Sequence, residues 1–361
     1  MTGKSVVKKL LPNPDELRKY RQWQRGVFFS KADLIQSQKS KIKSQNYSLK
    51  VKSLQKVVKY HLNSEITHLE KLPRATLHDV FRVKTPGGNY IVRTRAEEIR
   101  AFEFYLDELA FKEMAKLGVR SCGVAAVDVS RTLVPFDYEI LTEAAGSLIH
   151  DRVRIGRIRP EVFRGFGRVV AVIHNVKTRK YGPFDMEKLI SGGIAEGIWL
   201  TWTDYLLVNL DEHVQTCLEA GILTDADAMT VREILPRILF SLPPVPPTLL
   251  HGDLANHNAF TDGKSITALV DWEDAVSGDP VYDIAYYGTG CFGHDDWLKE
   301  FIEGYVENAA LPADFERRYA GYYIRIALAK AVGRLKHGKK GRGLPDSAKR
   351  IQEGVRALKS V

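Results

Sequence analysis

Short runs that mix apolar and polar positions, of the kind that form β-strands, lie between residues 66 and 95. They cover residues 66–72, 79–85 and 90–95. Gly87 and Gly88 separate the last two runs, and glycine supplies the positive φ that tight turns need. The pattern predicts a β-rich unit that contains a hairpin.

A helical pattern follows in residues 97–118, where the apolar positions fall mainly at helical spacing and Gly118 ends the run. These positions are Phe104, Leu106, Leu109, Phe111, Met114 and Leu117. Two further strand-like runs, residues 124–129 and 137–143, close this first unit.

Beyond Gly146 the pattern is predominantly helical. Long helices are expected around residues 160–177, 201–220 and 225–240. A proline-rich stretch at 242–248 interrupts the helical pattern, and short apolar strands at 248–250 and 266–270 then flank polar loops. A small β-rich lobe followed by a larger helical lobe suits a nucleotide held in the cleft between them.

Composition limits the class of protein. With 361 residues, 44% of them apolar and 27% charged, the chain is expected to be globular. No apolar run approaches the roughly 18 residues of a membrane span, so we expect a soluble, cytoplasmic protein. Its three cysteines, Cys122, Cys217 and Cys291, form no CxxC pair, which argues against a disulfide framework or a zinc site.

The net charge of +9 is unevenly distributed along the chain. Residues 1–60 carry fifteen Lys and Arg against three Asp and Glu, and residues 316–361 carry thirteen against three. The body between them is therefore acidic, which is compatible with a cationic substrate. Solvated surface helices would explain the same distribution. Nucleic-acid binding is not favoured, because no aromatic and basic interleaving accompanies the basic ends.

One polar loop carries the first candidate for chemistry. His251, Gly252 and Asp253 follow a short apolar strand, and Asn258 comes five positions after the aspartate. An aspartate there can reach a substrate hydroxyl, and an asparagine one turn further can offer its amide oxygen to a metal. The structural alternative is a loop capped by Asp and Asn side chains.

Asp271 is the second candidate, because it ends the apolar run of residues 266–270. A carboxylate at the end of a buried strand is costly unless it is paired, protonated or bound to a cation. Mg²⁺ meets that need with one or two protein oxygens plus phosphates and water. Structural hydrogen bonding at a loop end is again the alternative.

The residues after Asp271 read DWEDAVSGDPVYDIA. The combined pattern HGDLxxxN and DWxxAxxGDPxxDIA resembles the aminoglycoside phosphotransferase and choline kinase family. The GPF element at residues 182–184 and the Trp-x-Asp segment at 202–204 are most similar to the hygromycin-type antibiotic kinases of that family. The resemblance implies a bilobal, protein-kinase-like α+β fold and ATP-dependent phosphorylation of a small-molecule hydroxyl. It implies that Asp253 is the catalytic base and that Asn258 and Asp271 bind magnesium. His251, Asp279 and Asp283 would brace the catalytic loop.

The same resemblance implies nucleotide contacts in the first lobe. Arg93 would hold the phosphates where most relatives have lysine, and Glu108 would fix it, with Glu103 and Asp107 as open alternatives. Other contacts are expected from Thr76 and His78 in the glycine-poor phosphate loop, and from the backbone of Glu143 and Ala145 at the hinge.

The resemblance also sets the expected domains and acceptor region. Residues 1–60 would be a basic helical extension, 61–142 the nucleotide-binding lobe, and 143–361 the lobe with the catalytic loop. Acceptor contacts are expected from Trp202, Asp204, Asp295 and Asp296, although core packing and solvent exposure would explain these residues equally well.

An aminoglycoside or amino sugar is the favoured acceptor. A metabolic kinase of choline, a sugar or homoserine, and a regulatory pseudokinase, are the alternatives. The sequence leaves open ATP or GTP as the donor and whether the chain forms a homodimer.

Overall fold

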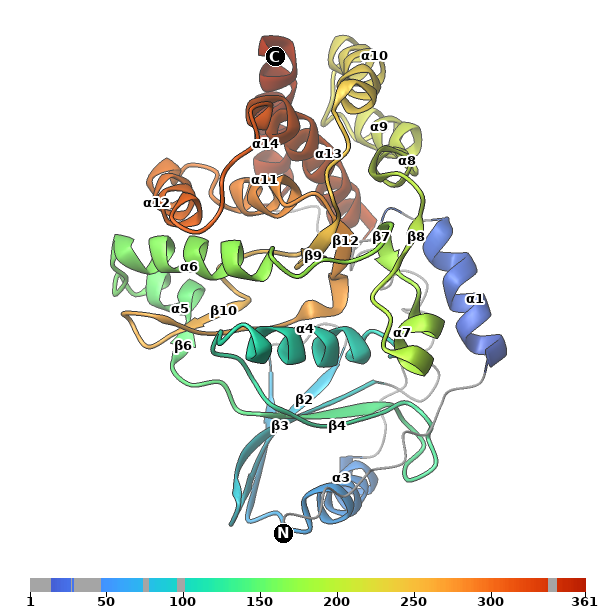
Figure 1. Ribbon diagram of the computed structural model, residues 1–361, viewed down its shortest axis with the longest axis vertical. Coiled ribbons are helices and arrows are strands. Elements are labelled where there is room, and N and C mark those ends of the chain that lie inside the picture. The colour runs from blue at the N-terminus through green and yellow to red at the C-terminus, as the bar shows by residue number, and fades with distance from the viewer. Residues whose placement is uncertain (1–13, 27, 29–46, 74–77, 96–100, 337–342) are drawn as a thin grey trace.

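The computed structural model describes residues 14–26, 28, 47–73, 78–95, 101–336 and 343–361. A β-rich lobe lies at the bottom of Figure 1 and a helical lobe at the top. Within these ranges, no helix has both the length and the apolar character needed to cross a membrane.

The β-rich lobe is built on one antiparallel sheet of five strands in the order β1-β2-β3-β5-β4. The strands are β1 (His68–Leu72), β2 (Asp79–Thr85), β3 (Gly88–Thr94), β4 (Val124–Asp128) and β5 (Tyr138–Thr142). Thr85 pairs with Gly88 across the turn, where Gly88 has a φ of 143°. The strands and the hairpin expected from the sequence are therefore confirmed.

Two helices cover opposite faces of this sheet, α3 (Tyr47–Leu62) below it and α4 (Phe104–Lys116) above it in Figure 1. Leu54, Val57 and Val58 of α3 are fully buried in a cluster with strand residues of the sheet. Burial of this kind is the main source of stability for a short amphipathic helix. Helix α3 therefore supplies part of the core of the β-rich lobe.

The other described helix of the N-terminal sixty residues, α1 (Pro14–Arg25), packs elsewhere. It lies beside α7 (Met186–Gly192) of the helical lobe, where Arg21 forms an ion pair with Asp185 at 3.1 Å. Phe28 is buried and stacks on Tyr205, with 5.1 Å between ring centroids. The described parts of this basic stretch thus pack on two different lobes.

Helices make up most of the second lobe. They are α5 (Ile149–Arg154), α6 (Pro160–Ile173), α7 (Met186–Gly192), α8 (Trp202–Leu207), α9 (Leu210–Glu219), α10 (Asp225–Ser241), α11 (Val281–Gly290), α12 (Asp295–Val306), α13 (Phe315–Lys336) and α14 (Gly343–Ser360). Helix α13 is central, since it packs against α9, α10, α11 and α14. Most of its residues are buried, which explains why it shows no amphipathic pattern.

The prediction of a single long helix at 201–220 is wrong, because the helix is interrupted between α8 and α9. Asn209 has a left-handed φ of 55°, which asparagine tolerates better than most residues, and its side-chain amide donates to Gly26 O at 3.1 Å. The break turns α9 relative to α8 and places Asn209 against the end of α1.

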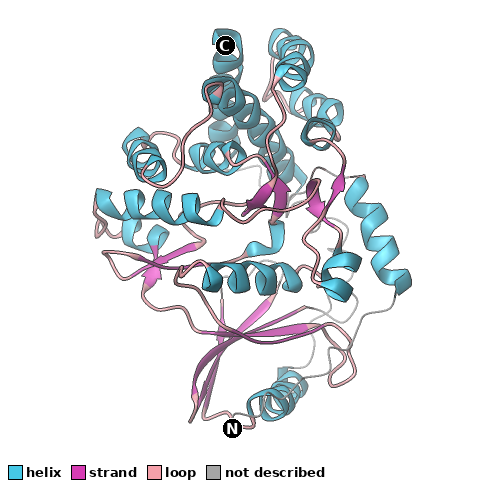
Figure 2. Cartoon of the chain, in the orientation of Figure 1, coloured by secondary structure: helices cyan, strands magenta, loops and turns pink. Residues whose placement is uncertain are grey.

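Two small sheets lie between the lobes' main elements, as Figure 2 shows. One has the order β8-β7-β12-β9 and the other β11-β10-β6. Their strands are β6 (Ser147–Leu148), β7 (Tyr181–Phe184), β8 (Gly197–Trp199), β9 (Thr248–Leu250), β10 (Ala259–Thr261), β11 (Ile266–Leu269) and β12 (Val276–Gly278). Strands β9 and β11 confirm the two apolar strands expected there, and each leads into a loop that carries a sequence motif.

Candidate active site

The loop after β9 is anchored by hydrogen bonds to the carboxylate of Asp283. Asp283, near the start of α11, accepts hydrogen bonds from the backbone N–H of His251 (2.7 Å) and of Gly252 (2.9 Å). Gly252 has a φ of 77°, and a Cβ at this position would lie 1.9 Å from Asp274 O. Only glycine fits there, so the HGD motif is required by the backbone as well as by chemistry.

Asp253, the next residue, is largely buried and receives two hydrogen bonds. The Tyr286 hydroxyl donates to Oδ1 at 2.8 Å, and Asn258 Nδ2 donates to Oδ2 at 3.1 Å. The same Asn258 amide donates to the Asp253 carbonyl oxygen at 2.9 Å. These bonds fix the orientation of the carboxylate.

His251 joins this loop to the one that follows β11. Its Nε2 contacts Val270 O at 3.0 Å, and the Asp253 N–H donates to its Nδ1 at 3.2 Å, so the ring is neutral with its proton on Nε2. Burial lowers the pKa of His251, against the opposing effect of Asp283 and Asp253 nearby. The histidine therefore braces the loops, as expected from the family resemblance.

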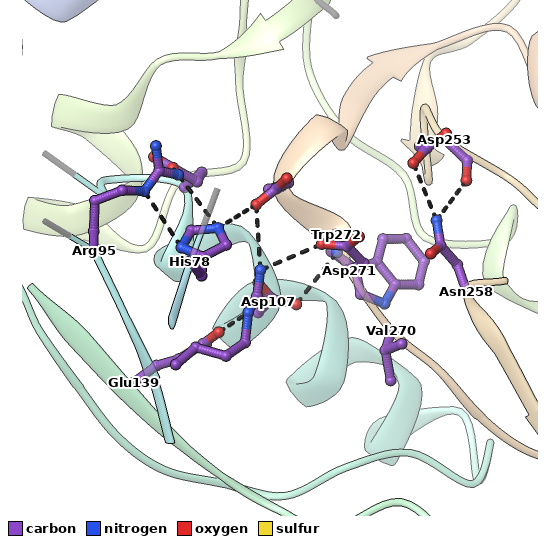
Figure 3. A network of polar contacts seen from close by, with 12 residues as sticks. His78, Arg95, Asp107, Glu139, Asp253, Asn258, Val270, Asp271 and Trp272 are labelled. Atoms are coloured by element: carbon purple, nitrogen blue, oxygen red, sulfur yellow. Dashed lines mark hydrogen bonds and ion pairs between the residues drawn. The ribbon is translucent and has the colours of Figure 1, made fainter. Parts of the chain in front are cut away.

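Asp271 stands directly after Val270 and has a left-handed φ of 70°. Its carboxylate is 30% exposed, and Arg93 Nη2 donates to Oδ1 at 3.3 Å. In Figure 3, Asp271 lies between the Asp253 and Asn258 pair and the polar network of the β-rich lobe.

The donor set suits a magnesium ion. Asn258 uses its amide nitrogen on Asp253, which turns the amide oxygen away from that carboxylate. An amide oxygen and the Asp271 carboxylate are hard oxygen ligands of the type Mg²⁺ prefers. In addition to burial, the charges of Asp271 and Glu273 each raise the pKa of Asp107, so a divalent ion here would reduce the repulsion among these carboxylates.

Arg93 on β3 is the centre of that network. Its guanidinium contacts Asp107 Oδ2 at 2.9 Å, Glu139 Oε1 at 2.6 Å and Glu273 Oε2 at 3.2 Å, in addition to Asp271. Burial raises the pKa of Asp107 to about 6 despite the opposing charge of Arg93. The network connects the β-rich lobe to the loop after β11.

The acid that fixes Arg93 on α4 is Asp107, which was an open alternative, and not Glu108. Glu108 instead pairs with Lys112 at 2.7 Å on the outer side of the helix. Asp107 is fully buried and also accepts from the Trp272 N–H at 3.2 Å. The physical reason is helix rotation, because neighbouring residues point about 100° apart.

His78, expected to contact phosphate, has protein partners at both ring nitrogens. The ring is buried, with Nε2 2.6 Å from Glu273 Oε2 and Nδ1 accepting from Arg95 Nε at 3.3 Å. Burial together with Arg95 and Arg93 lowers the pKa of His78 to about 3. Both nitrogens have protein partners, so His78 is a structural residue. Thr76 lies outside the described residues.

At the expected hinge, Glu143 and Ala145 follow β5. The Glu143 N–H donates to Asn89 O at 3.2 Å, and its carboxylate pairs with Arg82 at 2.6 Å. Ala145 O accepts from Thr267 Oγ1 at 2.5 Å. The adenine contacts of this segment stay a prediction.

Asp279 is buried and braces the lobe. It accepts from Arg318 Nη1 at 2.6 Å and from the Tyr322 hydroxyl at 2.7 Å, which joins the loop before α11 to α13. A direct contact of Asp279 with the catalytic loop, which was expected, stays a prediction.

The four expected acceptor residues do not gather around Asp253. Trp202 is buried beneath Gly278, and it packs on Tyr282 with 5.4 Å between ring centroids. Asp204 is exposed on α8, while Asp295 and Asp296 are exposed at the start of α12, on the opposite side of the lobe in Figure 1. Trp202 therefore belongs to the core, and the three acids are surface residues.

Sequence reasoning missed two side chains next to Asp253. Tyr286 comes three residues after Asp283 in the DIAYY run, at helical spacing that places both on the same side of α11. Lys330 on α13 lies over the Tyr286 ring, with Nζ 3.4 Å from its centroid. No motif marks Lys330, which is 77 residues away from Asp253 in the sequence.

A β-rich lobe and a helical lobe, joined through Arg93 and Asp271 beside a braced aspartate, define a protein-kinase-like fold. The chain belongs to the phosphotransferase enzyme family, which residues 68–320 match. It is a small-molecule phosphotransferase that acts on a hydroxyl group. The recognition, the enzyme class and the fold expected from the sequence are confirmed.

Named relatives and solved structures support the membership of this family. Hygromycin-B 4-O-kinase of Escherichia coli is 24% identical over 277 residues, which is 73% of each chain. The crystal structure of a thermostable mutant of aminoglycoside phosphotransferase APH(4)-Ia, a ternary complex with ADP and hygromycin B, is similar with a TM-score of 0.65 and 22% identity, over 84% of this chain and 98% of that one. A putative fructosamine-3-kinase from Haemophilus somnus gives a TM-score of 0.60 at 16% identity, over 87% and 99% of the two chains.

Replacing Arg93 by methionine is expected to lower the free energy of unfolding by about 3–5 kcal/mol, because Asp107, Glu139 and Glu273 would lose their buried cation. Arg82→Met is the matched control, since Arg82 lies on the adjacent strand β2 and pairs with Glu70 and Glu143 near the surface. Its loss should cost about 1 kcal/mol or less. Urea unfolding measures both, and equal losses would contradict the central role of Arg93.

Proposed function

We propose that this chain uses Mg²⁺ and ATP to phosphorylate a hydroxyl group of a small molecule, with Asp253 as the general base. The observation that carries the proposal is the fixed Asp253 carboxylate, held by Tyr286 and Asn258 beside the loop that bears Asp271. Phosphoryl transfer requires mainly alignment and charge neutralisation, which a rigid constellation of this kind supplies.

Asp253 would accept a hydrogen bond from the acceptor hydroxyl, orient its oxygen toward the γ-phosphate and take up its proton. Tyr286 and Asn258 keep the carboxylate from rotating during this step. Asn258 and Asp271 would hold Mg²⁺. When bound, the ion neutralises charge on the phosphates.

In the β-rich lobe, Arg93 would contact the phosphates while Asp107 and Glu139 hold its guanidinium in place. The backbone around Glu143 to Ala145 would contact the adenine ring. We propose ATP as the donor, because solved relatives are named as complexes with ADP and with AMP-PNP.

The names of relatives favour an aminoglycoside or amino-sugar acceptor. One relative is a hygromycin kinase, and a second solved relative is named as a spectinomycin phosphotransferase in complex with ADP and spectinomycin, with a TM-score of 0.55. The fructosamine-kinase neighbour supports a metabolic sugar derivative as the alternative. The acidic residues expected to bind a cationic acceptor are dispersed, so these names are the main support for the antibiotic class.

A coupled assay of ADP release tests the proposed function. The enzyme would be given Mg²⁺ and ATP with hygromycin B, spectinomycin, amino sugars, choline, neutral sugars, hydroxy acids and sugar phosphates in turn. We expect acceptor-dependent ADP release with at least one class, and a rate lowered by about 10² or more in Asp253→Asn. If no class stimulates ADP release although Mg-ATP binds, the regulatory pseudokinase alternative would replace the kinase proposal.

A further inference from the structure

Three basic side chains gather on the helical lobe, and one of them, Lys330, lies near the candidate base Asp253. Lys330 and Arg334 lie one turn apart on α13, and Arg350 lies on α14, which packs along α13. Lys330 Nζ donates to Thr289 Oγ1 at 2.7 Å, and Arg334 Nη1 donates to Ser347 Oγ at 2.5 Å. We call Lys330, Arg334 and Arg350 the basic cluster.

The basic cluster lacks the carboxylate partners that other buried cations of this chain have. Arg318, on the same helix as Lys330, forms ion pairs with Asp279 at 2.6 Å and Asp314 at 2.7 Å. Within the described ranges, none of the three members of the basic cluster forms an ion pair. Arg350 Nε is buried and has no hydrogen-bond partner there either. A buried donor without a partner is costly, and three cations without a paired carboxylate repel one another, so the cluster is suited to an anion from outside the protein.

The carboxylates nearest to the cluster do not form close ion pairs with it. Asp253 acts on Lys330 through space, and Asp346 acts on Arg334. Glu353, one turn from Arg350 on α14, accepts from the Tyr323 hydroxyl at 2.8 Å. All three members of the basic cluster are half-buried, so they also reach the surface. The environment remains one in which an added negative charge is stabilised.

Tyr286 connects the basic cluster to the chemistry. Its hydroxyl donates to Asp253 Oδ1 at 2.8 Å, while Lys330 Nζ stands 3.4 Å from its ring centroid. A cation over the face of a tyrosine is a favourable arrangement that fixes both groups. A small molecule that presents a hydroxyl to Asp253 from the side of Tyr286 would therefore meet the basic cluster with another part of its structure.

We propose that the basic cluster binds an anionic group of the acceptor, a carboxylate or a phosphate, so that the substrate is a hydroxy acid or a sugar phosphate. The proposal rests on the kinase function proposed for Asp253 and specifies its acceptor. Carboxylates and phosphates form short, charge-assisted hydrogen bonds with guanidinium and ammonium groups, and both have the geometry that two arginines and a lysine can surround. It differs from the cationic acceptor that the charge distribution along the chain and the names of relatives favour.

The protonation state of Lys330 supports an anion at this place. Burial lowers the pKa of Lys330 to about 7, Asp253 opposes this, and Arg334 and Arg350 lower the pKa further. An anionic group among these three cations would favour the charged ammonium and raise that pKa. Binding of an anionic acceptor near pH 7.5 should therefore take up protons.

The test compares acceptors that differ only in charge, using the full-length enzyme with Mg²⁺ and ATP. Matched pairs are D-glycerate with glycerol, D-gluconate with D-glucitol, and glucose 6-phosphate with glucose, and hygromycin B represents the cationic class. We expect the highest kcat/KM with a carboxylate or phosphate member. In Lys330→Met and in Arg350→Gln, KM for that acceptor should rise by roughly tenfold or more, while KM for ATP changes by less than about twofold. Lys349→Met, exposed on α14 next to Arg350, is the control and should match the wild type.

Calorimetry with the same anionic and neutral compounds provides a readout that does not need turnover. Binding of D-gluconate or glucose 6-phosphate that is lost in Lys330→Met, with proton uptake measured in buffers of different ionisation enthalpy, supports the proposal. A preference for the neutral member or for hygromycin B, or equal binding by wild type and Lys330→Met, would overturn it while leaving the kinase function intact. Absent ADP release with every class would instead remove the kinase function, and anion binding would then be judged by calorimetry alone.

Discussion

Asp253→Asn is expected to lower kcat by about 10² or more, the scale of the loss of a general base. Asparagine has nearly the shape of aspartate and can still accept a hydrogen bond from Tyr286, but its amide cannot take the proton of the acceptor hydroxyl. KM for ATP should change little, because Asp253 is not proposed to contact the nucleotide. Steady-state kinetics on the purified variant, with whichever acceptor stimulates ADP release, measures the effect.

The control for this variant is Asp204→Asn, because Asp204 is an exposed aspartate on α8 away from the catalytic loop. It should retain wild-type turnover. Thermal unfolding of both variants checks that each is folded. A folded Asp253→Asn enzyme with unchanged kcat would remove the assignment of the base.

Asp271→Ala is expected to weaken Mg-ATP binding by about 10² or more, since it deletes the proposed carboxylate ligand. Binding of ATP in excess EDTA should be equal in wild type and variant, because that measurement excludes the ion. The variant should remain folded, as Arg93 keeps Asp107, Glu139 and Glu273 as partners. Isothermal titration calorimetry with and without Mg²⁺ gives both affinities.

Comparison of the titrations with and without Mg²⁺ shows whether Asp271 binds the ion. Wild-type affinity for Mg-ATP in Asp271→Ala would disprove the role of this carboxylate. An equal loss with and without Mg²⁺ would indicate that the residue supports the nucleotide site mechanically, through Arg93, and does not bind the ion.

The catalytic loops could be predicted from the sequence because their requirements are local. Gly252 must adopt a left-handed conformation against Asp274 O, and Asp283 must receive the two N–H groups before Asp253. Constraints of this kind appear as fixed residue types at fixed offsets. The strands around Gly87 and Gly88 were predictable for the same reason.

The partner of Arg93 was harder to choose, because Asp107 and Glu108 are adjacent and both acidic. The apolar pattern of α4 contains the answer. Phe104 and Phe111, three positions before and four after Asp107, are buried, so Asp107 shares their face. Glu108 points elsewhere and pairs with Lys112. The buried face of the helix is therefore the criterion that identifies the partner of Arg93.

The basic cluster could not be predicted from charge counts. Residues 316–361 are basic as a stretch, and the body before them is acidic, which suggested a negative binding site. Packing of α13 against both α11 and α14 brings Lys330, Arg334 and Arg350 together, with Lys330 over Tyr286. Net charge along a chain does not determine the local field, because the field depends on which side chains tertiary packing places together.

The near contact between position 252 and Asp274 limits how the enzyme can move. The catalytic loop and the turn after Asp271 are pressed backbone to backbone, with no room for even a methyl group between them. Both loops also belong to the helical lobe, so a hinge motion of the β-rich lobe would carry neither of them away from the other. The distance between Asp253, the proposed base, and Asp271, the proposed ion ligand, would therefore stay constant if the lobes opened and closed. Only the contacts that the β-rich lobe would make with the nucleotide would vary.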